Sequence, residues 1–283
     1  MILEKFNPVI PSEDDGFAIE ATTSWTFRRN QLIRHYLHVF TVTMERKFDY
    51  LVYLDLYAGS GLKRLENGEI ISGSPVIALS EPRHFSKYIF CEINKDYSDA
   101  LKVRVNKYCR QENILVFNGD PNHLIERLAY YIPDSTKKNK VATLCLIDPF
   151  SMNIDFETVR ILSELDVNFL VVLALPWNSK DSFHFCIDEE RELLNAFLGK
   201  PWSNYESGMP VSNNEMFFRN LVKYYHQNLR ELGYMAKGSF HKMEDTNYDI
   251  PFFFCGYYSN TTGTSKIHSE VLKRMSPQVK LFE

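Results

Sequence analysis

The sequence predicts an α/β fold: a doubly wound, mostly parallel sheet of seven strands that ends in an antiparallel hairpin. Three observations predict it. Strand-like apolar runs alternate with helical patterns over residues 51–175, as in parallel sheets with right-handed crossovers. The apolar run at 51–56 leads into a turn of small residues at 58–61. Two last apolar segments, 234–242 and 250–258, flank a polar turn and predict the hairpin.

The composition indicates a chain that can form a sizeable core. Of 283 residues, 45% are hydrophobic and 24% are charged, and the formal net charge is -4. A general electrostatic attraction to nucleic acid is therefore not indicated, although a local basic patch could still bind it. No apolar run approaches the roughly 20 residues of a membrane helix, and the first residues lack the layout of a secretory signal. We therefore expect no membrane association.

The five cysteines indicate a reducing compartment. They form no CxxC pair, and the sequence contains no metal-ligand spacing. Cys91, Cys145 and Cys255 lie inside apolar runs and are predicted to be buried thiols. We expect a cytoplasmic protein without a metal site.

The first half of the chain opens with an expected N-terminal arm at residues 1–23, followed by a single domain at 24–283. Asn67-Gly68 favours a two-residue hairpin turn, and proline is tolerated in the first helical turn, where its missing N–H needs no partner. The elements expected in order are a helix at 24–46, a strand at 51–56, a polar hairpin insertion at 62–73, a helix with Ser74 as N-cap and Pro75 at its first position, a strand at 88–91, a helix at 95–109, a strand at 114–118 and a helix at 121–131.

The second half completes the sheet and carries an insertion at 176–211, interpreted as a cap over the sheet edge with a charged helix near 188–198. The other expected elements are a strand at 142–147, a helix at 156–165, a strand at 169–175, a helix that a capping box from Ser212 to Glu215 begins and Gly233 ends, the two hairpin strands and a helix at 264–275. Five parallel strands followed by a hairpin are the layout of class I methyltransferases, which are Rossmann-like.

Four signals follow the carboxyl ends of successive predicted strands. Asp55 precedes the turn at 58–61, where only glycine accepts positive φ and lets a ligand approach the backbone. Glu92 ends the second strand, Asp120 follows the third and Asp148 follows the fourth. Ligands of open α/β sheets bind at this edge, so together the four signals predict a site for an adenosyl ligand.

S-adenosylmethionine is the predicted cofactor, because its ribose diol, adenine amine and ammonium each need an acceptor. Glu92 is expected at the ribose, Asp120 at the adenine amine, and Asp55 with the backbone around Gly59 at the amino-acid end. Taken singly, each has a structural reading: a plain turn, a solvated strand end or a helix cap. The full set of predicted cofactor-binding residues is Asp55, Tyr57, Ala58, Gly59, Gly61, Glu92, Ile93 and Asp120.

Asp148, Pro149 and Phe150 form the predicted catalytic motif. In methyltransferases that act on planar nitrogen, such a carboxylate and its carbonyl hydrogen-bond the target amine, and the aromatic side chain stacks on the target ring. A base in a duplex would have to be flipped out. The structural alternative is a strand-end turn in which Phe150 packs inside.

Two basic segments could contact a substrate or partner. One is a face of the first helix, which would contact phosphate or an acidic partner, or simply be solvated; it comprises Arg28, Arg29, Arg34, His35 and His38. The other is Lys63-Arg64 beside the glycine turn, which would reach substrate or form an exposed loop.

The ordered motifs resemble those of the three-Cys-motif partner proteins, bacterial and phage-associated proteins of methyltransferase-like fold. The resemblance covers roughly residues 25–180, and the chain departs from the family's usual pattern at Tyr57, Ser60 and Ser151. It implies a partner protein that carries three cysteines. The matching segments are residues 55–61, 73–75, 91–92, 119–120 and 147–150.

Two functions are therefore expected as alternatives. The first is an S-adenosylmethionine-dependent methyltransferase that acts on a nitrogen of a nucleobase or another planar group, with nucleic acid as one candidate substrate. The second is a non-catalytic methyltransferase-fold module that docks a partner protein. A nicotinamide-dependent dehydrogenase is disfavoured, because the turn lacks the third glycine of GxGxxG.

Overall fold

The structure is a computed structural model that describes residues 13–23, 25–108, 113–149, 152–174, 183–206, 213–242, 252–260 and 265–279. Its large sheet contains β2 (Tyr50–Asp55), β5 (Lys87–Glu92), β6 (Ile114–Asn118), β7 (Val141–Ile147), β8 (Asn168–Ala174), β9 (Met235–Lys242) and β10 (Phe252–Ser259). The strand order is β6-β5-β2-β7-β8-β10-β9. A smaller sheet, in the order β1-β3-β4, contains β1 (Glu20–Ala21), β3 (Leu62–Arg64) and β4 (Ile70–Ser72).

The pairing confirms the predicted fold class. β5 is parallel to both β2 and β6, whereas β10 is antiparallel to both β8 and β9. The inner strands are buried on both faces, as their continuous apolar runs require: in β2, Val52, Tyr53 and Leu54 are fully buried. The fold is thus α/β and Rossmann-like, with the mostly parallel seven-stranded sheet and terminal hairpin expected of a class I methyltransferase-like chain.

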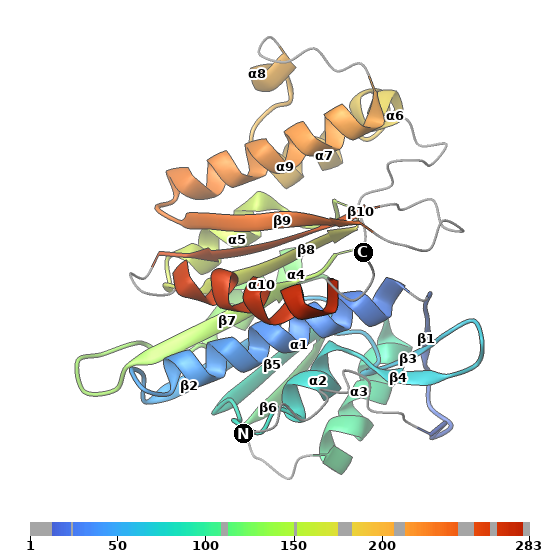
Figure 1. Cartoon of the computed structure of the whole chain (residues 1–283), viewed down its shortest axis with the longest axis vertical. Coiled ribbons are helices and arrows are strands. Elements are labelled where there is room, and N and C mark those ends of the chain that lie inside the picture. Colours follow the sequence, from blue (N-terminus) through green and yellow to red (C-terminus); the bar gives the residue numbers. More distant parts are fainter. Residues whose placement is uncertain are drawn as a thin grey trace. The chain divides into compact units, whose positions relative to one another are not determined.

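The chain divides into two compact units. The first comprises the described residues of Met1–Asp120, Pro133–Leu144 and Lys266–Glu283, and the second those of Pro121–Ile132 and Cys145–Ser265. Helices of the first unit are α1 (Trp25–Met44), α2 (Ser74–Leu79), α3 (Lys95–Tyr108) and α10 (Ser265–Val279). Helices of the second are α4 (Pro121–Tyr130), α5 (Phe156–Ser163), α6 (Phe183–Asp188), α7 (Arg191–Leu198), α8 (Ser203–Glu206) and α9 (Asn214–Glu231); both sets are labelled in Figure 1.

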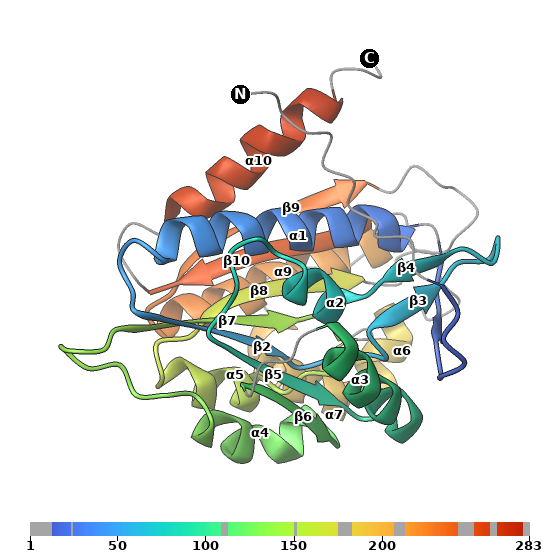
Figure 2. The same cartoon turned by 90° about the horizontal axis from the view of Figure 1, so that it is seen from below.

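In the first unit, α1 is a buried helix rather than a solvated one. Most of its apolar residues are buried, although Phe27 is 38% exposed. The Tyr36 hydroxyl is 2.6 Å from Nδ1 of His268 on α10; Figure 2 shows the two helices meeting. β3 and β4 form the antiparallel hairpin predicted around Asn67-Gly68. The hairpin pairs in turn with β1, in which Glu20 lies opposite Lys63.

In the second unit, α9 packs against β10 through ring contacts. The His226 ring centroid lies 5.1 Å from that of Phe254 and 5.2 Å from that of Tyr258. The Asn122 side chain joins α4 to α5 by accepting from Asp155 N at 3.0 Å and Thr158 Oγ1 at 2.8 Å. Three short helices, α6, α7 and α8, occupy the described part of the predicted insertion, where the sequence predicted one.

Two predicted helix starts were wrong by one residue. Gly73, not Ser74, is the N-cap of α2, and no side chain bonds there. Asn213, not Ser212, is the N-cap of α9, and its Oδ1 accepts from Met216 N at 2.8 Å. Ser212 itself lies outside the described residues. The predicted end of α9 is confirmed, since Gly233 follows it with a φ of 89°.

The described cysteines agree with the sequence: Cys91, Cys145 and Cys255 are buried thiols, as is Cys186. None of the helices in the described ranges has both the length and the apolar character needed to cross a membrane.

Candidate functional site

The turn after β2 has a backbone conformation and a close packing that favour glycine at positions 59 and 61. Gly59 and Gly61 have φ values of 63° and 82°, in the region that favours glycine. A Cβ on Gly61 would come within 3.0 Å of Leu101 Cδ1. Ala58 N donates to Cys91 O at 2.9 Å, which joins the turn to the end of β5.

Glu92, the last residue of β5, is hydrogen-bonded to this turn. Its side chain points at the turn, because Oε2 accepts from Gly59 N at 2.7 Å and Oε1 accepts from Asn94 N at 2.7 Å. The residue is only 8% exposed. Burial raises the pKa of the Glu92 carboxyl above its ordinary value, although the two backbone N–H groups oppose this. The carboxylate therefore has a fixed position at the carboxyl end of its strand.

The end of β6 is tied to the same place. Gly119 N donates to Glu92 O at 3.0 Å, and Asn118 Nδ2 donates to the carbonyls of Glu92 and Ile93 at 2.9 and 3.1 Å. Ile93 leaves 62% of its surface exposed, although it is apolar. Asp120, half-buried, follows directly. Three neighbouring strand ends thus bring together the residues that the sequence predicted for the adenosyl part of a cofactor.

Asp55, the last residue of β2, is hydrogen-bonded to residues on either side of it in the chain. It is fully buried, and its carboxylate accepts from Tyr57 N at 3.2 Å and from the Tyr53 hydroxyl at 3.1 Å. These bonds fix the entry to the turn. The expected contact of Asp55 with the amino-acid end of a cofactor stays a prediction.

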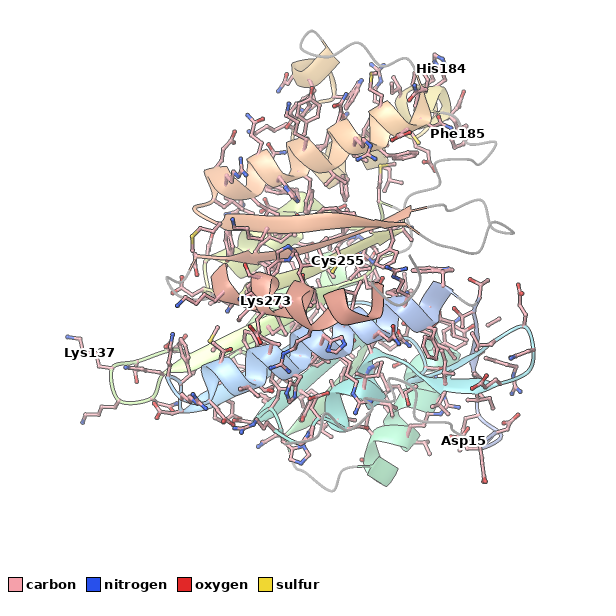
Figure 3. The ribbon with its side chains drawn as sticks, viewed as in Figure 1. Asp15, Lys137, His184, Phe185, Cys255 and Lys273 are labelled. Atoms are coloured by element: carbon pink, nitrogen blue, oxygen red, sulfur yellow. The ribbon has the colours of Figure 1, made fainter. Side chains whose placement is uncertain are left out.

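Residues 15–20 form an unpredicted strap that is bound to the glycine turn by Arg104 of α3. The Arg104 side chain is fully buried. Nε and Nη2 donate to the two Asp15 carboxylate oxygens at 2.9 and 2.7 Å, and Nη1 donates to Ala18 O at 2.8 Å and Ser60 O at 2.6 Å. Figure 3 labels Asp15 in this segment. No local sequence pattern signals the strap, since its anchor lies 89 residues from Asp15.

The strap places a second carboxylate at the turn. A Cβ added to Gly59 would lie 2.7 Å from Oε2 of Glu20. Lys63 Nζ donates to both Glu20 carboxylate oxygens, at 2.9 and 2.8 Å. The Lys63 side chain is 10% exposed and that of Glu20 is 32% exposed, so Lys63 lies in a partly buried ion pair rather than in an exposed loop. Its predicted contact with a substrate stays a prediction. After burial and the backbone bonds, Glu20 raises the pKa of Glu92 and Lys63 lowers it, so this pair acts on the same site.

The predicted catalytic motif follows β7. Asp148 is half-buried and Pro149 is buried. Phe150 lies outside the described residues, as does Ser151. The role of this motif stays a prediction.

Three residues of the predicted basic face of α1, Arg29, Arg34 and His38, make contacts within the protein. Arg29 is 7% exposed, with its guanidinium 5.0 Å from the centroid of the Trp25 ring. Arg34 Nε and His38 Nδ1 lie 3.4 and 3.3 Å from the carboxylate of Glu81, which is fully buried.

A pocket of 610 Å³ lies in the second unit between α5, α7 and α9. Its charged side chains are paired: Arg160 contacts Glu157 and Glu164 at 2.6 Å each, and Lys200 contacts Glu231. None of the residues that line it belongs to the predicted site. They are Asp155, Phe156, Glu157, Arg160, Asn195, Ala196, Gly199, Lys200, Pro201, Asn228, Glu231 and Leu232.

Comparisons with known proteins support the fold. The chain matches no protein-family model and no curated protein. Among solved structures it is similar to protein LPL1258 of Legionella pneumophila str. Philadelphia 1, with 14% identity, a TM-score of 0.50 and coverage of 87% of this chain and 91% of that one. At this identity the likeness shows a shared fold alone.

Two further solved structures align at lower TM-scores. One is the O-methyltransferase TomG from Streptomyces achromogenes in complex with SAM, with 9% identity, a TM-score of 0.43 and coverage of 82% and 79%. The other is the methyltransferase domain of bacterial CtHen1, with 11% identity, a TM-score of 0.39 and coverage of 81% and 99%. The resemblance to the three-Cys-motif partner proteins is not confirmed, and neither is the three-cysteine partner that it implies.

Proposed function

We propose that this chain is an S-adenosylmethionine-dependent methyltransferase that transfers a methyl group to a nitrogen of a nucleobase or another planar group. One observation carries the proposal. The buried Glu92 carboxylate is fixed by Gly59 N and Asn94 N at the carboxyl ends of two neighbouring parallel strands, where open α/β sheets bind nucleotide-like ligands.

The residues at this turn fit that cofactor. Each Glu92 oxygen accepts one backbone N–H and has a further lone pair for a ribose hydroxyl. Ile93, with 62% of its surface exposed, offers an apolar surface for an adenine ring beside Glu92. Gly59 has no Cβ to hold a ligand away from the backbone. Asp120 remains the proposed acceptor for the adenine amine.

The remaining roles concern transfer. When bound, S-adenosylmethionine would supply an activated methyl group on its sulfonium. Asp148 would accept an N–H of the target amine and hold the nitrogen lone pair toward that methyl group, which is a positioning effect rather than acid–base catalysis. Pro149 would keep this carboxylate at the strand end. The stacking role proposed for Phe150 follows from the sequence alone.

Replacing Glu92 by glutamine is expected to weaken the binding of S-adenosylhomocysteine, the demethylated product, by about 10- to 100-fold. The glutamine side chain would lack the negative charge and one of the two acceptor oxygens, and hydrogen bonds to charged groups contribute about 1.5–3 kcal/mol. Calorimetric titration measures the change. The matched control is Glu126→Gln on an exposed position of α4, which should bind as the unaltered chain does. Equal affinities for all three proteins would remove Glu92 from the site.

The same titration should depend on pH. Because burial raises the pKa of Glu92 above its ordinary value of 4.5, affinity should fall on acidification with a midpoint above that value, as the protonated carboxyl loses an acceptor. Glu92→Gln should abolish this step. The effect on folding has the opposite sign: a raised pKa favours the folded state at low pH, and that contribution is lost as pH rises through the folded-state value. Affinity that rises on acidification would contradict the assignment.

Asp148→Ala is expected to retain affinity for S-adenosylhomocysteine and to lose methyl transfer by about 100-fold or more, the scale of a misplaced reacting group. Transfer of a labelled methyl group to pools of nucleic acid and small planar amines identifies the acceptor, and the variant is then compared on it. Asp134→Ala, at an exposed loop position, is the control. Unchanged turnover of the Asp148→Ala variant on the identified acceptor would contradict the proposed role of Asp148.

A non-catalytic docking module is the second candidate. It is favoured by apolar side chains that remain exposed in the second unit, Phe185 at 40% and Met216 at 38%; Figure 3 shows Phe185 on α6. The two elements that bear them are joined where Phe183 N donates to Asn214 Oδ1 at 2.8 Å. Stable co-purification with a partner protein, together with no transfer to any acceptor pool, would favour this function over catalysis.

A further inference from the structure

The Glu20–Lys63 ion pair lies at the glycine turn, within the site proposed for the cofactor. Glu20 Oε2 occupies the space directly over Gly59, 2.7 Å from where a Cβ would stand. Its side chain is 32% exposed and that of Lys63 is 10% exposed. Burial raises the pKa of the Tyr97 phenol, and the negative charges of Glu20 and Glu92 raise it further. A ligand that reaches Gly59 and Glu92 therefore meets Glu20 and Lys63.

A zwitterionic amino acid is the chemical complement of this pair. It carries an ammonium and a carboxylate on one carbon atom, whereas the chain presents a carboxylate and an ammonium side by side on paired strands. We propose that Glu20 and Lys63 form the subsite for the amino-acid end of the cofactor: Glu20 accepts from the ligand ammonium and Lys63 binds the ligand carboxylate. This inference rests on the proposed function.

Burial of the neighbouring carboxylate supports the assignment. Asp55 has no exposed surface, and its oxygens already accept from Tyr57 N and the Tyr53 hydroxyl. The Glu20 side chain, in contrast, is 32% exposed. The ammonium of an incoming ligand would therefore compete with Lys63 Nζ for the Glu20 carboxylate and would leave the bonds of Asp55 in place.

The energetics also favour a ligand over a purely structural role. A partly buried ion pair such as this one adds little to folding, because desolvation and lost side-chain freedom offset its attraction. Ligand binding changes this balance. One internal pair would open and two charge-assisted contacts would form, one from each side chain to the ligand.

The experiment compares two adenosyl ligands that differ at the amino-acid end. S-adenosylhomocysteine carries that end, and 5′-methylthioadenosine lacks it while keeping the adenine, ribose and sulfur. The unaltered chain should bind the first at least about 10-fold more tightly than the second, as expected for hydrogen bonds to charged groups. Glu20→Gln and Lys63→Met should each reduce this preference, taken as the ratio of the two affinities measured on the same variant, by about 10-fold.

The charge-swapped variant Glu20→Lys/Lys63→Glu tests the same subsite if either single variant fails to fold because it leaves one charge without its partner. It keeps an ion pair between the two strands but reverses its orientation, so it should bind 5′-methylthioadenosine normally and lose the preference for S-adenosylhomocysteine. A preference retained in all three variants would overturn the subsite and leave the proposed function intact. Failure of the unaltered chain to bind either ligand would instead overturn the proposed function itself.

Discussion

Replacing Arg104 by alanine is expected to lower the free energy of unfolding by about 3–5 kcal/mol, the scale for breaking a buried charge pair from one side. The guanidinium is fully buried and supplies donors to Asp15, Ala18 O and Ser60 O. Without it, two carbonyls would lose this donor, and the Asp15 carboxylate would be left with the bond from Phe17 N at 3.3 Å. Denaturant unfolding measures the loss, and hydrogen exchange should show reduced protection of the strap.

Arg160→Ala is the matched control for this change. Arg160 also contacts two acidic groups, Glu157 and Glu164, but its side chain is 44% exposed. Such a surface network contributes only about 0–1 kcal/mol. Similar losses in the two variants would contradict the anchoring role of Arg104. A lysine at position 104 should restore only part of the stability, because it cannot present the planar fork of donors.

Replacing Gly199 by alanine is expected to lower the free energy of unfolding by roughly 2–5 kcal/mol, the sum of a backbone cost and a packing cost. Gly199 caps the end of α7 with a φ of 68°, a conformation that costs other residues about 1–2 kcal/mol. In addition, a Cβ there would lie 2.7 Å from Phe156 Cδ1 and 2.8 Å from Phe156 Cβ. Relieving such overlap in a packed site costs about 1–3 kcal/mol more.

Gly68→Ala separates the two causes. Gly68 has a similar φ of 85°, and a Cβ there would meet nothing within 4 Å. It should therefore show the backbone cost alone in the same denaturation experiment. If the Gly199 and Gly68 variants lost equal stability, the overlap with Phe156 would carry no cost.

The elements that the sequence predicted well are those with a local signal. Continuous apolar runs such as 51–56 are typical of strands buried on both faces, and β2 is such a strand. The position of Glu92 at the end of a strand could be predicted because it ends one of these apolar runs, whereas its role at a cofactor stays a proposal. Its bond to Gly59 N follows from the parallel pairing of the two strands.

The residues that were missed depend on long-range contacts. Arg104 lies in a helix whose sequence looks polar and solvated, yet its partners are 44 to 89 residues away. The sequence around Lys63 is typical of a loop, whereas in the structure Lys63 lies in β3 and pairs with β1. The caps of α2 and α9 were each misplaced by one residue, because serine, asparagine and glycine all favour that position and only the backbone geometry decides between them.

The contact between Tyr36 and His268 has a consequence for the order in which the protein is completed during synthesis. α1 and α10 belong to one compact unit, yet 232 positions of chain separate these two residues. Because domains begin to fold as the chain emerges, the face of α1 that receives α10 has to remain uncovered until nearly all of the described chain has left the ribosome. Tyr36 therefore gains this partner only when His268, which comes late in the described chain, has been synthesised.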